Sequence, residues 1–249
     1  ILQVVEANRH LLGPNDDYFA YQVISRGVSD PARRMGVDSR GGGGHATVAI
    51  SCEPLAFQSY AKFYITGARA ITPATRRTPP QCLSPKGKIS NKMNHIICMY
   101  ESHAIDPESF ALMLDLDGNV TESHGANFLF VSGGVIKVPN RRNVLPGTTM
   151  QALLDLATNI GIPIEENDYT PFDVYQGEEA FLTTGSFTLL PIVSLNGVPI
   201  GKGVPGPVAH RLISSFSDLV GLDIVEQALS HIPAEERRAL QKGAVPSTP

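Results

Sequence analysis

Residues 110–140 read FALMLDLDGNVTESHGANFLFVSGGVIKVPN, and this stretch predicts two consecutive β-hairpins. Apolar runs of strand length flank an Asp-Gly pair at 117–118 and a Gly-Gly pair at 133–134, and such pairs are typical of two-residue hairpin turns. Glu122 ends the return strand of the first hairpin, where a carboxylate is ordinarily exposed. The stretch therefore favours a hairpin-rich sheet with one carboxylate at its edge.

The chain beyond this stretch mixes helices with more strands. The segment NVLPGTTMQALLDLATNIGIPI predicts a turn and then a helix over about 148–160, which ends at a glycine. Residues 178–201 predict two strands around a TTGSF turn and a hairpin at an Asn-Gly pair, and a last helix is expected over 207–219. Together these elements predict an α+β (mixed α/β) fold.

Four regions are expected along the chain. Residues 1–80 are rich in strand signals, including DYFAYQVIS, HATVAIS and ARAITPAT, and predict a small α/β domain. Residues 81–87 concentrate Pro, Gly and Ser and form the predicted linker. A larger domain is expected over 88–222, followed by a C-terminal tail, 223–249, whose Pro- and Ser-rich end should be partly disordered.

Composition limits the classes of ligand. The chain is 42% hydrophobic and 18% charged, which is typical of a globular protein. A net charge of -4, a pI near 6.0 and no long basic run give no reason to expect a nucleic-acid or membrane partner. Cys52, Cys82 and Cys98 lack metal-type or disulfide-framework spacing, which favours a reducing, cytoplasmic compartment and no metal site. A small metabolite is the expected ligand.

Two turns could serve a cofactor that carries a phosphate. Gly147, Thr148 and Thr149 open a helix, so free N–H groups, hydroxyls and the helix dipole point to one place; an ordinary threonine cap is the alternative. Gly185 and Ser186 lie in a second hydroxyl-rich turn, which is equally consistent with a tight strand connection. Neither pattern is specific alone.

A basic cluster precedes the helix predicted over 90–102, which Ser90 caps. The helix carries four apolar residues on one face: Met93, Ile96, Ile97 and Tyr100. Lys86, Lys88 and Lys92 together indicate a solvated patch. Lys88 differs because it lies on the extended entry to the helix, where burial could lower the pKa of its amine and prepare it for imine formation.

The order of these motifs resembles the class IV aminotransferases, a pyridoxal-phosphate-dependent family that includes branched-chain and D-amino-acid aminotransferases, R-selective amine transaminases and aminodeoxychorismate lyase. KISNKMNHIICMYES resembles the family's lysine segment, which selects Lys88 over its neighbours. LMLDLDGNVTESHGANFLFV resembles the acidic hairpin, whose Glu122 would pair with the pyridine nitrogen. NVLPGTTMQALLDLA and AFLTTGSFTLLPI resemble the phosphate turns, which places around the phosphate Thr148, Thr149, Gly185 and Ser186.

The resemblance implies transamination through a Schiff base on Lys88, from a branched-chain-like amino acid or an amine to a 2-oxo acid, in a homodimer. Two other readings stay open: an elimination of the aminodeoxychorismate-lyase type, and a pyridoxal-phosphate-binding remnant without catalysis. In both enzymatic readings Lys88 would act as nucleophile and base.

The sequence also departs from the family pattern. The family has further N-terminal residues, including a phosphate-binding arginine, without counterpart here, so the chain is expected to begin within the small domain. Met150 stands where an arginine often follows the phosphate turn, and Ser123 where a glycine usually follows the acidic residue. Arg33 is the candidate for binding the substrate carboxylate, with a surface arginine as the alternative.

Overall fold

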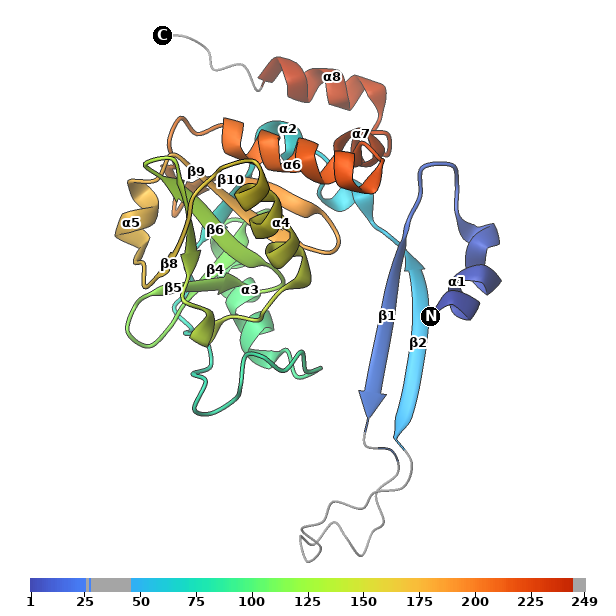
Figure 1. Cartoon of the computed structure of the whole chain (residues 1–249), viewed down its shortest axis with the longest axis horizontal. Helices are drawn as coiled ribbons and strands as arrows, with labels where there is room; N and C mark the ends of the chain where they lie inside the picture. Colours follow the sequence, from blue (N-terminus) through green and yellow to red (C-terminus); the bar gives the residue numbers. More distant parts are fainter. Residues whose placement is uncertain (26, 28–45, 244–249) are drawn as a thin grey trace, which may run out of the picture. The chain divides into compact units, whose positions relative to one another are not determined.

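The computed structural model describes residues 1–25, 27 and 46–243, and it divides the chain into two compact units (Figure 1). Unit 1 is Ile1–Ala56 and unit 2 is Phe57–Pro249. The division falls earlier than the predicted boundary at 80, because the strand at 68–71 pairs within the sheet of unit 2. Arg33, the candidate carboxylate binder, lies outside the described residues.

Unit 1 is a β-hairpin preceded by a short helix. It contains α1 (Leu2–Asn8), η1 (Arg9–Leu11), β1 (Tyr18–Ser25) and β2 (Thr47–Pro54). The two strands pair antiparallel along their whole length, from Tyr18 opposite Pro54 to Ser25 opposite Thr47. Both strands were predicted from their content of β-branched and aromatic residues.

Unit 2 contains the remaining strands and helices. Its strands are β3 (Ala68–Ile71), β4 (Phe110–Leu114), β5 (Val120–Ser123), β6 (Asn127–Ser132), β7 (Val135–Pro139), β8 (Ile164–Asn167), β9 (Glu179–Thr184), β10 (Thr188–Leu195) and β11 (Val198–Pro199). Its helices are η3 (Phe57–Ser59), α2 (Phe63–Thr66), α3 (Met93–Ile105), η4 (Arg141–Asn143), α4 (Thr148–Asn159), α5 (Pro171–Tyr175), α6 (Pro207–Val220), α7 (Ile224–Leu229) and α8 (Ala234–Gly243).

Six strands of unit 2 close into a ring. β10 pairs with β3 and β3 with β4 in parallel, and antiparallel pairs then join β4 to β5, β5 to β6, β6 to β9 and β9 back to β10. β7 and β8 extend the sheet from β6, and β11 extends it from β10. Closure buries both faces of the central strands, and the residues of β6 from Asn127 to Val131 are all buried. Each large apolar side chain enclosed there contributes about 2 kcal/mol.

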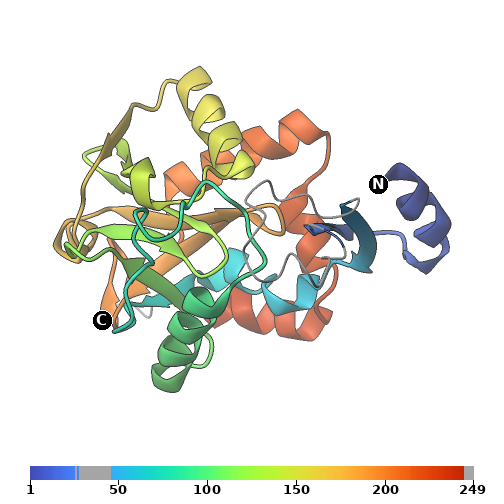
Figure 2. The ribbon, with the colours of Figure 1, turned by 90° about the horizontal axis from the view of Figure 1, so that it is seen from below.

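Helices cover the ring on different sides (Figure 2). α3 packs against β3 and β4, where Cys98, Ala111 and Met113 are completely buried together. α4 and α6 contact each other and pack against β9, and α6 also contacts β10. The hairpin turns at 117–118 and 133–134 and the helix beginning at Thr148 form as predicted.

Two helices differ from the sequence predictions. α3 begins at Met93, three residues later than predicted, because the Asn91 side chain accepts the Met93 N–H (3.2 Å), so Ser90 is not its cap. Its predicted apolar face is solvent-exposed, with Met93 and Tyr100 each about two-thirds exposed (67% and 66%). The tail is also more ordered than predicted, since it forms α7 and α8 up to residue 243.

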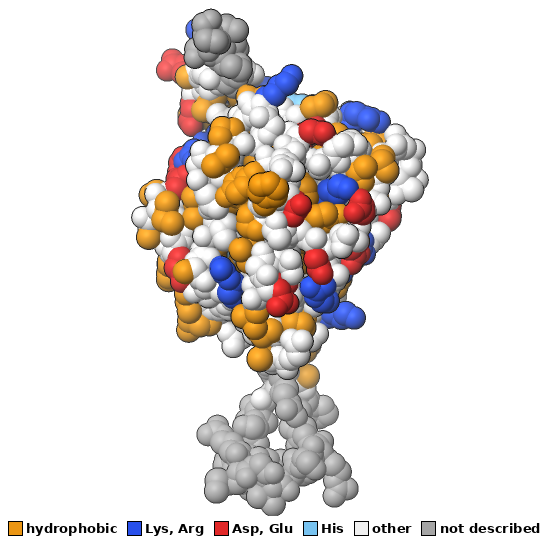
Figure 3. Space-filling model, turned by 90° about the vertical axis from the view of Figure 1, so that its left-hand side faces the viewer, with side chains coloured by type: hydrophobic (Ala, Val, Ile, Leu, Met, Phe, Trp, Pro, Cys, Tyr) orange, Lys and Arg blue, Asp and Glu red, His pale blue; other side chains and the backbone are white. Residues whose placement is uncertain are grey.

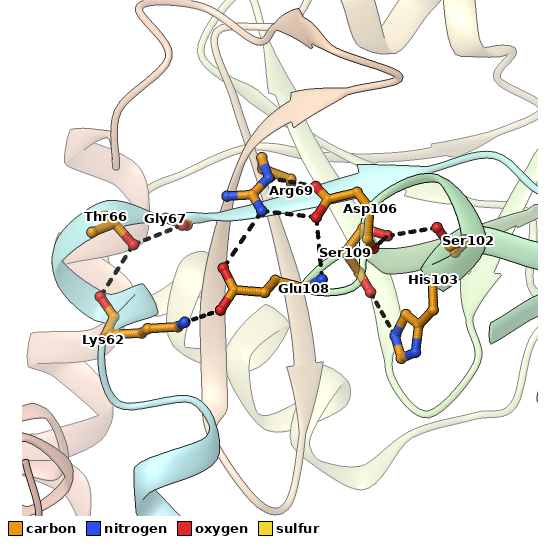
Figure 4. Close-up of polar contacts among 9 residues, drawn as sticks. All are labelled: Lys62, Thr66, Gly67, Arg69, Ser102, His103, Asp106, Glu108 and Ser109. Carbon is orange, nitrogen blue, oxygen red and sulfur yellow. Dashed lines mark hydrogen bonds and ion pairs between the residues drawn. The ribbon is translucent and has the colours of Figure 1, made fainter. Parts of the chain in front are cut away.

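An ion-pair cluster fixes the end of α3 to β3 and α2 (Figure 4). Arg69 of β3 donates to both carboxylate oxygens of Asp106 (2.5 and 2.9 Å), and Lys62 donates to Glu108. Ser109 Oγ donates to the Asp106 carbonyl (2.8 Å). The hydrogen bond from Arg69 lowers the pKa of Asp106, and the one from Lys62 lowers the pKa of Glu108. The C-terminal end of α3 is therefore held against β3 and the start of α2.

The surface of unit 2 mixes charge signs. Acidic and basic side chains are interspersed with hydrophobic ones on the face shown in Figure 3. Within the described residues, no helix combines the length and the apolar character needed to cross a lipid bilayer.

Candidate cofactor site

A row of polar side chains lies at one end of the strand ring. Glu122 on β5 pairs with Asn127 on β6, and Asn127 pairs with Thr183 on β9. Directly opposed residues of antiparallel strands place their side chains on the same face. All three are at least 95% buried, so this end of the sheet carries an enclosed polar row.

Glu122 is not the exposed strand-end carboxylate that its place in the sequence suggested. It is 4% exposed, and its Oε1 accepts from Arg77 Nε at 2.9 Å. Its Oε2 accepts the backbone N–H of Leu145 at 2.8 Å, and His95 Nε2 lies 3.8 Å from Oε1. A buried carboxylate needs such partners, because an unpaired charge in the interior costs several kcal/mol.

α3 positions Arg77 through the segment 75–78. Glu101 accepts from the backbone N–H and the hydroxyl of Thr75 (2.9 and 2.5 Å), and these bonds lower the pKa of Glu101. The Asn94 side chain donates to the Arg76 carbonyl and accepts the Thr78 N–H (2.8 and 3.0 Å). This segment is thereby held along α3, with the Arg77 guanidinium directed at Glu122.

The turn before α4 adjoins the same carboxylate. Leu145, which donates to Glu122, lies two residues before Gly147, the N-cap of α4. No side chain caps this helix among the described residues, so the alternative of an ordinary threonine cap does not apply. Thr148 and Thr149 occupy the first turn, where free N–H groups and the helix dipole favour an anion.

Two tyrosines hold the loop between β9 and β10. Tyr60 Oη donates to the Ser186 carbonyl (2.9 Å) and Tyr64 Oη to the Phe187 carbonyl (2.6 Å). Burial raises the pKa of Tyr64, which keeps its hydroxyl protonated as a donor. Gly185 and Ser186 follow Thr183 closely, so this loop lies at the same end of the ring as Glu122.

Lys88 lies in an exposed, irregular segment just before α3. The pKa of Lys92 is lowered, first by burial and then by the positive charge of Lys88, while Glu122 acts in the opposite direction. Lys88 and Glu122 are therefore both within electrostatic reach of Lys92. The structure describes no hydrogen bond between Lys88 and Glu122.

Two histidines complete the surroundings. His124 follows β5 and stacks on Phe110, with ring centroids 5.9 Å apart. Burial, followed by the charges of His103 and His95, lowers the pKa of His124 to about 4, so it is neutral near pH 7. Among the described residues, the buried atoms His95 Nδ1 and Thr183 Oγ1 have no hydrogen-bond partner.

Sequence reasoning missed Arg77, His95 and Asn127. Arg77 stands beside the predicted linker, where an arginine indicates only a solvated turn. Asn127 looks like an ordinary residue at the start of a strand, and only the register opposite Glu122 gives it significance. His95 had one usable signal, since a polar residue within an apolar helical run marks a packed or functional position.

The chain matches known protein families. The model of the family described as amino-transferase class IV matches residues 21–195. The branched-chain-amino-acid aminotransferase of Escherichia coli K12 is 26% identical over 227 residues, covering 87% of this chain and 70% of that protein. The D-alanine aminotransferase of Listeria innocua is 27% identical over 197 residues, covering 79% and 65%.

Solved structures give the same result. A branched-chain amino acid aminotransferase from the source abbreviated T.th., complexed with N-(5'-phosphopyridoxyl)-L-glutamate, matches with a TM-score of 0.64 and 29% identity. The match covers 72% of this chain and 58% of that one. The present chain thus spans between 58% and 70% of the length of these three relatives. The predicted α+β fold of the class IV type is confirmed.

Proposed function

We propose that this chain, which belongs to the class IV aminotransferase family, binds pyridoxal phosphate and transfers an amino group from an amino acid to a 2-oxo acid. The observation that carries the proposal is the buried Glu122, paired with Arg77 and bonded to the turn that opens α4. This places a carboxylate beside a helix N-terminus, and the cofactor needs both.

The residues of the site fit this cofactor. Its phosphate needs N–H and hydroxyl donors, which Thr148 and Thr149 supply in the first turn of α4. Its ring nitrogen needs a carboxylate, and Glu122 is enclosed and paired there. The buried, unpartnered Thr183 Oγ1 lies in the same row of side chains as Glu122, as expected beside a polar ligand. We include Gly185 and Ser186 as the second phosphate loop.

We assign Lys88 to the covalent attachment of the cofactor and to proton transfer. When bound, pyridoxal phosphate supplies an electron-withdrawing ring that accepts the electrons released from the substrate Cα–H bond. After the substrate amine has displaced it, Lys88 Nζ carries the proton between the substrate Cα and the C4′ atom of the cofactor. Glu122 keeps the ring nitrogen protonated, and the α4 turn holds the phosphate in place.

Absorbance after loading with pyridoxal phosphate tests this assignment. The protein is mixed with the cofactor and desalted, and the unmodified chain is compared with Lys88→Ala. Lys92→Ala and Lys86→Ala are matched controls, because these lysines lie in the same segment. We expect a retained visible band in the unmodified chain and both controls, and its loss in Lys88→Ala. A band that instead disappears with Lys92→Ala would move the assignment to Lys92, and no band in any variant would refute cofactor binding.

For substrates, we propose a branched-chain-like amino acid as donor and a 2-oxo acid as acceptor, following the names of the relatives. The D-alanine aminotransferase match makes D-alanine the competing donor. Loaded protein is incubated with 2-oxoglutarate and either L-leucine or D-alanine, and glutamate is measured. Glutamate formed from L-leucine supports the proposal. Pyruvate released from an amino substrate without 2-oxoglutarate would instead indicate a lyase.

We also propose a cytoplasmic homodimer. The described cysteines, Cys52, Cys82 and Cys98, are all free thiols, which supports a reducing compartment. The exposed apolar side chains of α3 are surface that a second subunit could cover. Light scattering during size-exclusion chromatography measures the mass directly, and a monomer at micromolar concentration would refute the dimer.

A further inference from the structure

Asn127 links the two parts of the site that would bind opposite ends of the cofactor. It begins β6 directly opposite Glu122 and is 5% exposed. Its Nδ2 donates to the Leu145 carbonyl at 2.8 Å and lies 3.5 Å from Glu122 Oε2. The Leu145 N–H donates to that same Oε2 at 2.8 Å. The amide, the carboxylate and the turn backbone therefore form one closed set of hydrogen bonds.

The other side of the Asn127 amide is in close contact with Gly147. A Cβ added at Gly147 would lie 2.0 Å from Asn127 Oδ1, far inside any allowed contact. The backbone of Gly147 has φ -68° and ψ 131°, which any residue adopts without strain. Glycine is therefore needed here for the close approach of Asn127 and not for its dihedral freedom.

These contacts fix the distance between Glu122 and the start of α4. Asn127 Nδ2 and Oδ1 contact the turn on both sides of Pro146, at Leu145 and Gly147. The cofactor is a rigid ring with its nitrogen and its phosphate on different sides, so it binds best when carboxylate and phosphate turn are already correctly spaced.

We propose that Asn127 is a positioning residue that sets the spacing between Glu122 and the phosphate turn before pyridoxal phosphate binds. This inference rests on the proposed function, because it assumes that Glu122 and the first turn of α4 hold the same molecule. Gly147 is the matching partner, whose missing side chain lets the Asn127 amide reach the turn.

The test is a double-mutant cycle with two measurements. The variants are Asn127→Ala, Gly147→Ala and the double variant, together with the isosteric Asn127→Asp, which replaces the donor by an acceptor. The dissociation constant for pyridoxal phosphate is measured by titration, and urea unfolding is measured without cofactor. Thr121→Val is the matched control, because Thr121 is adjacent to Glu122 on β5, similarly buried, and loses a hydrogen bond to the Met113 carbonyl (2.8 Å).

We expect Asn127→Asp and Asn127→Ala each to weaken cofactor binding about 10-fold or more, the effect of losing a hydrogen bond to a charged group. Gly147→Ala should weaken it similarly, whereas the double variant should bind no more weakly than Asn127→Ala, since alanine removes the clashing Oδ1. Thr121→Val should lose stability without losing affinity.

Three results would overturn the inference. One is an unchanged dissociation constant in Asn127→Asp. Another is additive losses in the double variant, which would mean that Asn127 and Gly147 act separately. The last is affinity in Thr121→Val that falls in step with stability, which would reduce Asn127 to a structural role. All three leave the proposed function standing, because that depends on the absorbance band of the unmodified chain and its loss with Lys88→Ala.

Discussion

Replacing Arg77 with methionine should destabilise the protein far more than replacing an exposed arginine. The side chains of Arg77 and Glu122 are only 7% and 6% exposed, and their closest N and O atoms are 2.9 Å apart. Removing one member of a buried ion pair leaves an uncompensated charge and typically costs about 3–5 kcal/mol. Glu122 keeps the Leu145 N–H, so we expect a loss near the lower end, about 3 kcal/mol.

Urea unfolding of the cofactor-free protein at pH 7 measures this loss. The chain has no tryptophan, so far-UV circular dichroism is the suitable signal. Glu122→Gln and the double variant Arg77→Met with Glu122→Gln complete the cycle. Because the double variant leaves no buried charge at either position, its loss should be smaller than the sum of the single losses. A loss below about 1 kcal/mol in Arg77→Met, or additive losses, would refute the buried ion pair.

Two further predictions concern the environment of the site and the fold. The folded-state pKa of His124, about 4, lies below its ordinary value of 6.5, so the stabilisation is present above pH 6.5 and is lost as the pH falls towards 4. His124→Gln should remove an acid loss on the order of 3 kcal/mol between urea unfolding at pH 7 and pH 4, and an unchanged pH dependence would contradict this. Gly206→Ala would place a Cβ 2.1 Å from Glu179 Cδ, and this carboxylate accepts two N–H groups at the start of α6 (2.8 and 2.9 Å). We expect a loss of about 2–4 kcal/mol, seen as a lower melting temperature by calorimetry; an unchanged temperature would show that the carboxylate has room to move.

The local parts of the fold could be predicted from the sequence. The hairpin turns at 117–118 and 133–134 and the start of α4 depend on residues that are neighbours in the chain, such as Asp-Gly and Gly-Thr pairs. The start of α3 was misplaced because Asn91 and Ser90 are both competent to cap a helix, and only the local geometry decides between them.

The environment of Glu122 could not be predicted, because it depends on contacts between distant segments. Arg77 reaches Glu122 only after α3 has packed on β3 and β4 and has bound segment 75–78. The membership of β3 in the large sheet has the same origin, since its partners are β10 and β4, both distant in sequence. The family resemblance selected Lys88 and Glu122, but it did not supply the partners of Glu122.

The polar row also determines where the chain can gain or lose residues during evolution. Side chains alternate between the two faces of a strand, so inserting one residue between Glu122 and Asn127 would turn the amide away from the carboxylate. The turns at 117–118 and 133–134 lie at the opposite ends of β5 and β6, and a Cβ at any of their glycines would meet open space. Insertions and deletions should therefore accumulate at those distal turns, while the short loop 123–126 keeps a constant length across homologues.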